Sequence, residues 1–123
     1  MDNKLPIRIN TEYCRISINR KTIAAIGDPT FIHLGYDPDI KSLMILGTWV
    51  DDTKAVRVTF TRSGSFYIYS KKLIEGIRQV GNVMTYPGSY LLYGMKIKNA
   101  PAISFCLADA DKMCDGIPGE SSL

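Results

Sequence analysis

The stretch IRINTEYCRISINRKTIAAIG, residues 7–27, sets how this chain folds, because a similar stretch, VRVTFTRSGSFYIYSKKLIEGI, returns at residues 56–77. Each begins with alternating apolar and polar residues, the period-two pattern of a strand with one buried face. Each then passes through a turn and a second strand into apolar residues at helical spacing. The two stretches differ mainly by two extra residues near the second turn. The repetition predicts one structural unit used twice.

Each unit is predicted to consist of a strand, a turn, a strand, a short helix and a closing two-strand hairpin. In the first unit, Asn19 suits the N-cap of the helix, because its side-chain oxygen can accept a backbone N–H of the first turn. Ile23 and Ile26 give this helix a buried stripe, and Gly27 suits the left-handed position just past its end. Residues 37–39, Asp-Pro-Asp, predict the turn of the hairpin.

The second unit is predicted to start with a strand from Val56, in which Val58 continues the alternation. Ser70 is expected to cap a longer helix that ends at Gly81 and has an apolar face formed by Leu73, Ile74, Ile77 and Val80. When the two units are aligned with Ile18 against Tyr69, Ile68 falls on the outward side of its strand.

We therefore predict an α+β, mostly β fold, in which two tandem ββαββ units of swapped-hairpin type interlock into one barrel-like, pseudo-symmetric core. The domain is expected to span residues 1–107, with repeat one at 5–46 and repeat two at 55–107. The linker at 47–54 is short, so the halves should pack against each other. Residues 108–123 are polar and acidic and are predicted to form a flexible tail.

The composition is that of a globular protein, with 46% hydrophobic and 22% charged residues. No apolar run is long enough to span a bilayer and the first residues do not resemble a signal peptide, so we expect a cytoplasmic protein with no membrane partner. The cysteines are odd in number, and all three, Cys14, Cys106 and Cys114, are expected to be reduced. Residues 1–98 carry a net charge of +6 and residues 99–123 one of −3, which permits a polyanionic partner.

Residues 16–27, ISINRKTIAAIG, resemble the swapped-hairpin family of AbrB, MazE and MraZ proteins. In that family a strand with a pattern like VTIPKEIREALG enters a short helix that a hairpin follows, and MraZ-type proteins carry two such units in one chain. Here Asn19 replaces the usual proline, and the Asp-x-x-x-Arg signature of MraZ is missing. The resemblance implies a DNA-binding transcriptional regulator. It extends to small uncharacterised proteins of Gram-positive bacteria and their mobile elements, which imply no activity.

The resemblance also implies that basic side chains near the first hairpin and helix of each unit reach double-stranded DNA. Arginine and lysine suit this task through charge and through hydrogen bonds to phosphates and guanine edges. The candidate nucleic-acid-binding residues are Arg8, Arg15, Arg20, Lys21, Arg57, Arg62, Lys71 and Lys72. The plainer interpretation, that these are the solvated faces of amphipathic elements, fits a net charge of +6 slightly better.

A second hypothesis is a protein-interaction module, of adaptor or antitoxin type, that binds no nucleic acid. The oligomeric state stays open between a monomeric pseudo-dimer and a homodimer. We expect no enzyme, cofactor or metal: His33, the single histidine, lacks partners at metal spacing and is predicted to be structural. Several aromatics are predicted to pack across strands rather than to stack on single-stranded bases: Phe66, Tyr67, Tyr69, Tyr86, Tyr90 and Tyr93.

Overall fold

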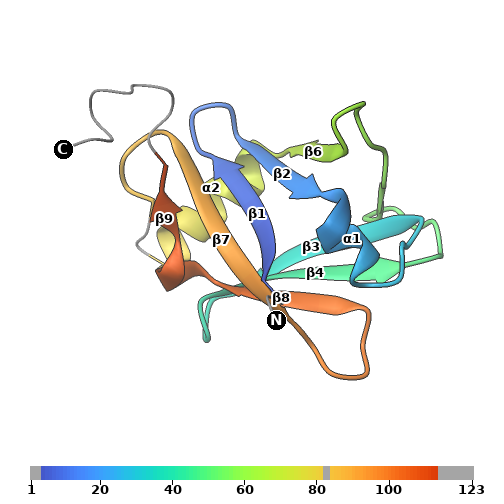
Figure 1. Cartoon of the computed structure of the whole chain (residues 1–123). Coiled ribbons are helices and arrows are strands. Elements are labelled where there is room, and N and C mark those ends of the chain that lie inside the picture. Colours follow the sequence, from blue (N-terminus) through green and yellow to red (C-terminus); the bar gives the residue numbers. More distant parts are fainter. Residues whose placement is uncertain (1–3, 82–83, 114–123) are drawn as a thin grey trace.

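The computed structural model describes residues 4–81 and 84–113, and Figure 1 shows their arrangement. The elements, in chain order, are β1 Leu5–Asn10, β2 Arg15–Asn19, α1 Arg20–Ala24, β3 Phe31–Asp37, β4 Ser42–Thr48, β5 Val56–Arg57, β6 Ser65–Tyr69, α2 Lys71–Gly81, β7 Ser89–Lys96, β8 Ala102–Cys106, a 3-10 turn at Leu107–Asp109 and β9 Asp111–Lys112. Within these ranges, no helix has both the length and the apolar character needed to cross a membrane.

The strands form one antiparallel sheet in the order β5-β3-β4-β8-β7-β1-β2-β6, with β9 paired to β7. The sheet curves into a half-barrel, which confirms a mostly-β fold with two helices. Four of its ladders join the first half of the chain to the second: β1 with β7, β2 with β6, β3 with β5, and β4 with β8. The two halves therefore share one sheet rather than forming separate sheets.

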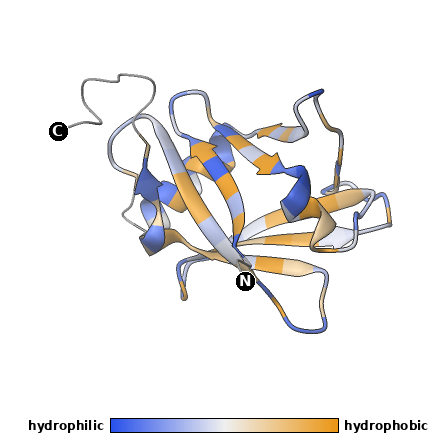
Figure 2. Cartoon of the chain, viewed as in Figure 1, coloured by the Kyte–Doolittle hydropathy of each residue, from blue (hydrophilic) through white to orange (hydrophobic). Residues whose placement is uncertain are grey.

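The core lies on the inner side of the curved sheet. Ile7 and Ile9 of β1 are almost fully buried, as are Ile16 and Ile18 of β2, because alternate side chains of a strand point to the same face. Helix α2 lies behind β1, β2 and β7 in Figure 1 and contributes Ile74 and Ile77 to the same apolar cluster. Figure 2 shows that apolar residues concentrate on the strands, whereas the start of α1 is hydrophilic.

The helix caps form as predicted. The side-chain oxygen of Asn19 accepts the backbone N–H of Lys21 at 2.7 Å, and the hydroxyl of Ser70 accepts the backbone N–H of Leu73 at 3.2 Å. Gly27, just beyond α1, has a φ of +90°, which glycine adopts without steric cost. The hairpin between β3 and β4 turns at residues 38–41, one residue later than the predicted 37–39.

The predicted outward position of Ile68 is wrong. Ile16 of β2 lies opposite Ile68 of β6, and Ile18 lies opposite Phe66. Ile68 and Phe66 are buried, while Tyr67 is on the outer face. The alignment of the two units was one residue out of register, and such a shift moves every side chain of a strand to the other face.

Two further predictions need correction. The expected strand from Val56 through Val58 is only two residues long, because β5 pairs solely with Phe31 and Ile32 of β3. The tail was expected to begin at Ala108, but residues 108–113 continue the fold, with β9 paired to β7 at Tyr90 and Leu91. The remainder of the predicted tail, 114–123, lies outside the described residues, as does Cys114. The side chain of Val80, predicted to line α2, is likewise not described.

Candidate nucleic-acid interface

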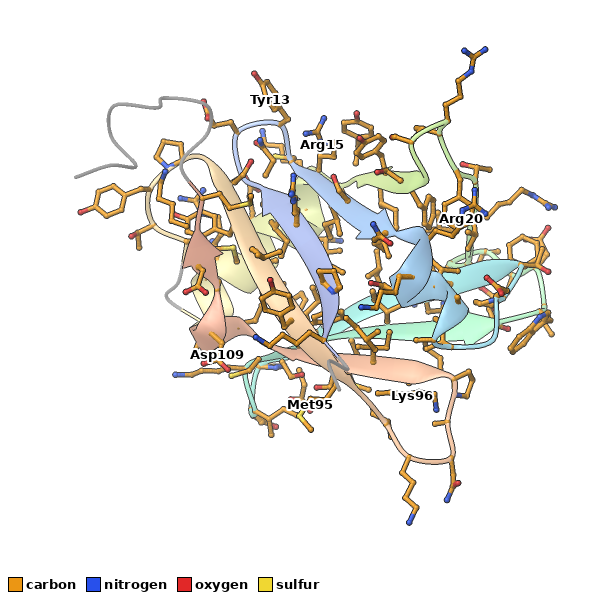
Figure 3. The ribbon with its side chains drawn as sticks, viewed as in Figure 1. Tyr13, Arg15, Arg20, Met95, Lys96 and Asp109 are labelled. Atoms are coloured by element: carbon orange, nitrogen blue, oxygen red, sulfur yellow. The ribbon has the colours of Figure 1, made fainter. Side chains whose placement is uncertain are left out.

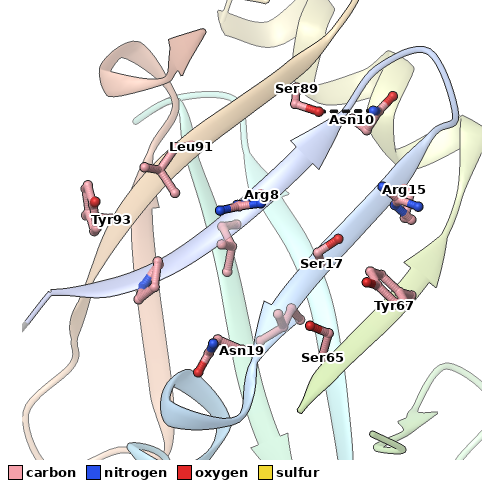
Figure 4. A pocket seen from close by; sticks show the side chains of 13 residues that line it. Arg8, Asn10, Arg15, Ser17, Asn19, Ser65, Tyr67, Ser89, Leu91 and Tyr93 are labelled. Carbon is pink, nitrogen blue, oxygen red and sulfur yellow. Dashed lines mark hydrogen bonds between the residues drawn. The ribbon is translucent and has the colours of Figure 1, made fainter. Parts of the chain in front are cut away.

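The outer face of strands β7, β1, β2 and β6 holds a groove with a volume of about 430 Å³, shown in Figure 4. It is lined by the side chains that alternate with the buried isoleucines of these strands, and so point away from the core. Among these lining residues are Arg8, Arg15, Ser17, Tyr67, Leu91 and Tyr93. The groove therefore follows from strand periodicity: one face of each strand builds the core and the other builds this surface.

Arg8 lies at the centre of the groove. It is opposite Leu91 of β7 on one side and opposite Ser17 of β2 on the other. Its side chain is exposed, and among the described residues it makes no hydrogen bond or ion pair. Among the described residues, none that lines the groove carries a carboxylate. The guanidinium is therefore available to an anion entering from solvent, with no internal acid to neutralise it.

Arg15 stands at one end of the groove between two tyrosine rings. Its guanidinium carbon lies 5.0 Å from the ring centre of Tyr67 and 5.9 Å from that of Tyr13. Both distances are within the range of a cation–π interaction. Its Nε is buried and has no hydrogen-bond partner in the part of the chain that the structure describes. The rings thus hold the plane of the guanidinium in place without neutralising its charge.

The remaining basic candidates flank the groove. Strands β2 and β6 are antiparallel and each leads into a helix, so α1 and α2 start beyond opposite ends of this ladder, which is itself roughly 13 Å long. One end carries Arg20 and Lys21 of α1, and Arg20 stacks on Phe60 at 4.1 Å. The other end carries Lys71 and Lys72 of α2. Figure 3 shows Arg15 and Arg20 well separated on the same side of the molecule.

Two candidates lie away from this set. Arg57 is on β5, which pairs only with β3, and its guanidinium stacks on Phe31 at 4.8 Å instead of lining the groove. Arg62 projects from the turn before β6 and is exposed. The structure thus brings Arg8 and Arg15 together, places Arg20, Lys21, Lys71 and Lys72 at the two ends, and separates Arg57.

The aromatic residues divide between the two faces. Phe66 and Tyr90 are buried, which agrees with the predicted packing role, but Tyr67, Tyr69, Tyr86 and Tyr93 are exposed. The sequence reasoning also missed the polar residues of the groove, Asn10, Ser17 and Ser89, of which Asn10 donates to the Ser89 hydroxyl at 3.1 Å. The sequence reasoning used the alternation only to find the apolar side chains that face the core. The polar side chains between them, which face outward, were the signal that could have identified the groove.

His33 has a partner that the sequence analysis did not identify. Its Nε2 lies 2.9 Å from a carboxylate oxygen of Asp52, which is the one ion pair among the residues described. The backbone N–H of Lys54 donates to the Asp52 carboxylate and, with the His33 contact, lowers the pKa of Asp52 below its ordinary value. No three His, Cys, Asp or Glu side chains of the described chain gather as a metal site would require. The pair joins β3 to the segment that leads into β5.

Comparison with known proteins does not extend this description. The chain gave no match among protein-family models, curated proteins or solved structures. The functional argument therefore depends on the groove and on its charges.

Proposed function

We propose that this protein binds nucleic acid and acts as a DNA-binding regulator, with the groove and the helix starts at its two ends as the contact surface. The observation that carries the proposal is the groove itself, whose described lining contains Arg8 and Arg15 and no carboxylate. Cations that neutralise phosphates release the counterions of the nucleic acid, and this release provides most of the non-specific affinity of such proteins.

The charge balance of the surface supports the proposal. None of the eight basic candidates forms an ion pair with a described residue, since the one pair there is His33 with Asp52. Unpaired cations on one face favour a ligand that supplies the anions.

We also propose that the two halves are related by an internal pseudo-two-fold axis, as in swapped-hairpin proteins with two units in one chain. Exchanging β1 to β4 with β5 to β8 turns the β1–β7 ladder into the β5–β3 ladder, and β3–β4 into β7–β8. The ladders β2–β6 and β4–β8 each map onto themselves. The pairing order supports a duplicated arrangement in which a single chain provides both halves of a surface.

Two hydrogen bonds at the helix entries agree with such an axis. The backbone N–H of Arg20 donates to the carbonyl of Gly64 at 3.0 Å, and the backbone N–H of Ser70 donates to the carbonyl of Cys14 at 2.9 Å. Cys14 and Gly64 both have positive φ, 50° and 83°. An axis through the facing pair of Ser17 and Tyr67 relates these contacts, and this pair lies in the groove. A monomer would then present the two helix starts symmetrically to one ligand.

The first test compares two arginines that occupy similar sequence positions. Fluorescence anisotropy with a random-sequence DNA duplex at about 50 mM salt should give binding near the micromolar range. Arg8→Gln should weaken binding several-fold and reduce the slope of log affinity against log salt by about 0.9 for one lost phosphate contact. Arg57→Gln is the matched control, because Arg57 lies outside the groove. Absence of duplex binding at this salt concentration would rule out duplex DNA as the ligand of this surface.

A protein-interaction module is the second candidate, and one observation favours it. Trp49 and Val50 are 55% and 66% exposed, next to each other in the segment after β4. Exposed apolar patches of this kind are typical of protein-binding surfaces. A pull-down from nuclease-treated lysate separates the two functions: a partner lost in Trp49→Ala but kept in Arg8→Gln favours this candidate over DNA binding.

A further inference from the structure

Tyrosine rings form two opposite walls of the groove. Tyr67 of β6 and Tyr93 of β7 are 38% and 45% exposed, and Arg8 stands between them in Figure 4. Three strand-to-strand steps separate the two walls, roughly 14 Å in all. Each ring therefore offers surface to the groove, with a cation placed between the two.

A DNA duplex cannot use these ring faces well. Its bases are stacked on one another inside the helix, and a protein surface meets phosphates and base edges. A base that has left the stack, by contrast, can lie on an aromatic ring, and this contact is tolerant of base identity. Exposed tyrosines in a recess with arginines are the combination found where proteins bind single strands.

Other features of the groove suit an unstacked nucleotide. Arg15 is already held between Tyr13 and Tyr67, so its flat guanidinium extends the stacking surface beyond the Tyr67 ring. Ser17 adds a hydroxyl to the lining, where it can meet a base edge, and Asn10 and Ser89, bonded to each other, complete its polar part. The volume of about 430 Å³ is within the range of pockets that hold small organic ligands.

We propose that this groove binds a single-stranded segment of nucleic acid, with Tyr67 stacking on a base and Arg8 contacting the adjacent phosphate. The proposal rests on the proposed function, nucleic-acid binding, and specifies the form of the ligand. Tyr93, whose ring centre lies 4.9 Å from the amine of Lys4, forms a second stacking wall.

The test uses the full chain and three labelled probes: oligothymidylate and oligouridylate of about 12 nucleotides, and a duplex of the same length. Anisotropy titrations give the affinity for each probe. Tyr67→Leu removes the ring and should weaken binding of the single strands about tenfold, the effect expected for one lost stacking contact. Tyr67→Phe keeps the ring and should bind like the unmodified protein.

Tyr86→Leu is the matched control, because Tyr86 is 71% exposed and does not line the groove. Circular dichroism and thermal unfolding of each variant check that the fold is retained. If Tyr67→Leu does not fold, Arg8→Gln, which changes an exposed side chain, replaces it as the groove variant and should weaken binding of the single strands several-fold.

The outcomes separate the two proposals. Tighter binding of a single strand than of the duplex, reduced by Tyr67→Leu but not by Tyr86→Leu, supports the inference, and the stronger of the two single strands identifies DNA or RNA. Duplex binding that equals or exceeds single-strand binding, with no effect of Tyr67→Leu, overturns the inference and leaves the proposed function standing. Binding of no probe at about 50 mM salt overturns both. Binding of the single strands but not of the duplex supports the groove as a single-strand site and excludes duplex DNA as its ligand.

Discussion

The first hairpin of the chain and its counterpart in the second half have similar alternating sequences but different structures. Strand β1 has six residues and is paired along both edges, to β2 and to β7. Strand β5 has two residues and is paired along one edge, to β3. Ile7 and Ile9 are almost completely buried, whereas Val56 and Val58 are only half-buried.

This difference shows that the alternating pattern determines which face of a strand turns to the core, but not how long the strand is. Alternation selects the side of a strand that faces the core, and in both segments the apolar side chains turn inward. The length of a strand depends on whether neighbouring strands can pair with it. Between β5 and β6 the described chain has no ladder, and the sheet is open there. The two arginines differ for the same reason. Arg8, on a strand with a neighbour on each side, lines the groove, whereas Arg57, on a strand with one neighbour, stacks on Phe31.

The largest expected effect contrasts the cores of the two segments. Ile9→Ala should lower the free energy of unfolding by about 2–5 kcal/mol, because it leaves a cavity at a residue with no exposed surface. Val58→Ala should cost about 1 kcal/mol, because its side chain is half-buried and loses less. Urea unfolding followed by circular dichroism measures both. Equal losses would contradict the view that β1 lies within the core and the segment around β5 at its margin.

A second, smaller contrast concerns the turn between β1 and β2 and the turn that precedes β6. The side-chain oxygen of Asn10 accepts the backbone N–H groups of Glu12 and Tyr13, each at 2.9 Å, and its amide donates to Ser89. Asn10→Ala should therefore destabilise the protein by about 1–3 kcal/mol, since two part-buried backbone N–H groups lose a buried acceptor.

The matched change in the second turn is Thr61→Ala. The Thr61 hydroxyl accepts the backbone N–H of Ser65 at 3.3 Å in an exposed position, where water can replace it, so the loss should be about 0.5 kcal/mol. The same urea titrations apply. A Thr61→Ala variant that is destabilised as strongly as Asn10→Ala would show that the second turn is as important for stability as the first.

The smallest effect is the pH dependence of the contact that positions β5. The pKa of Asp52 is lowered from its ordinary value of 3.8, first by the backbone N–H of Lys54 and also by His33. A lowered pKa in the folded state means that the carboxylate stabilises the fold at pH values above 3.8, and that this contribution is lost as the pH falls through the lowered pKa.

Asp52→Asn should accordingly be less stable than the unmodified protein near neutral pH, and the difference should shrink as the pH is lowered. Urea midpoints from about pH 7 to about pH 3 measure this. Asp51→Asn is the control, because the Asp51 side chain is exposed and forms no hydrogen bond or ion pair with a described residue. A difference that grows on acidification would mean that the carboxylate does not stabilise this segment.

Much of the fold was predictable from local patterns. The caps at Asn19 and Ser70 depend on side chains within three residues, and the buried isoleucines of β1 and β2 follow from period two. The order of the strands was not predictable in the same way, because pairing β2 with β6 depends on residues some fifty positions apart. The register error at Ile68 has this origin: a local alignment cannot determine which residue lies opposite which.

The candidate site was predictable only in part. Arg8 and Arg15 were identified by charge and position, but the charge pattern alone could not separate them from Arg57, since all three lie in similar alternating segments. Their separation depends on the neighbours that each strand acquires in the sheet. The partnership of His33 with Asp52 is likewise tertiary, because it joins a strand to the segment after the next strand.

The pairing of β1 with β7 has a consequence for how the protein is made. Leu5 lies opposite Gly94, so β1 leaves the ribosome well before β7, the strand with which it pairs. At ordinary rates of translation, β7 is synthesised roughly 5–20 s after β1. During this time the apolar side chains of β1 are not packed against all of their final neighbours. The long-range ladders also place the protein among slow-folding topologies. We therefore expect the sheet to form only after β7 and β8 have been synthesised, in a single step that involves both halves together.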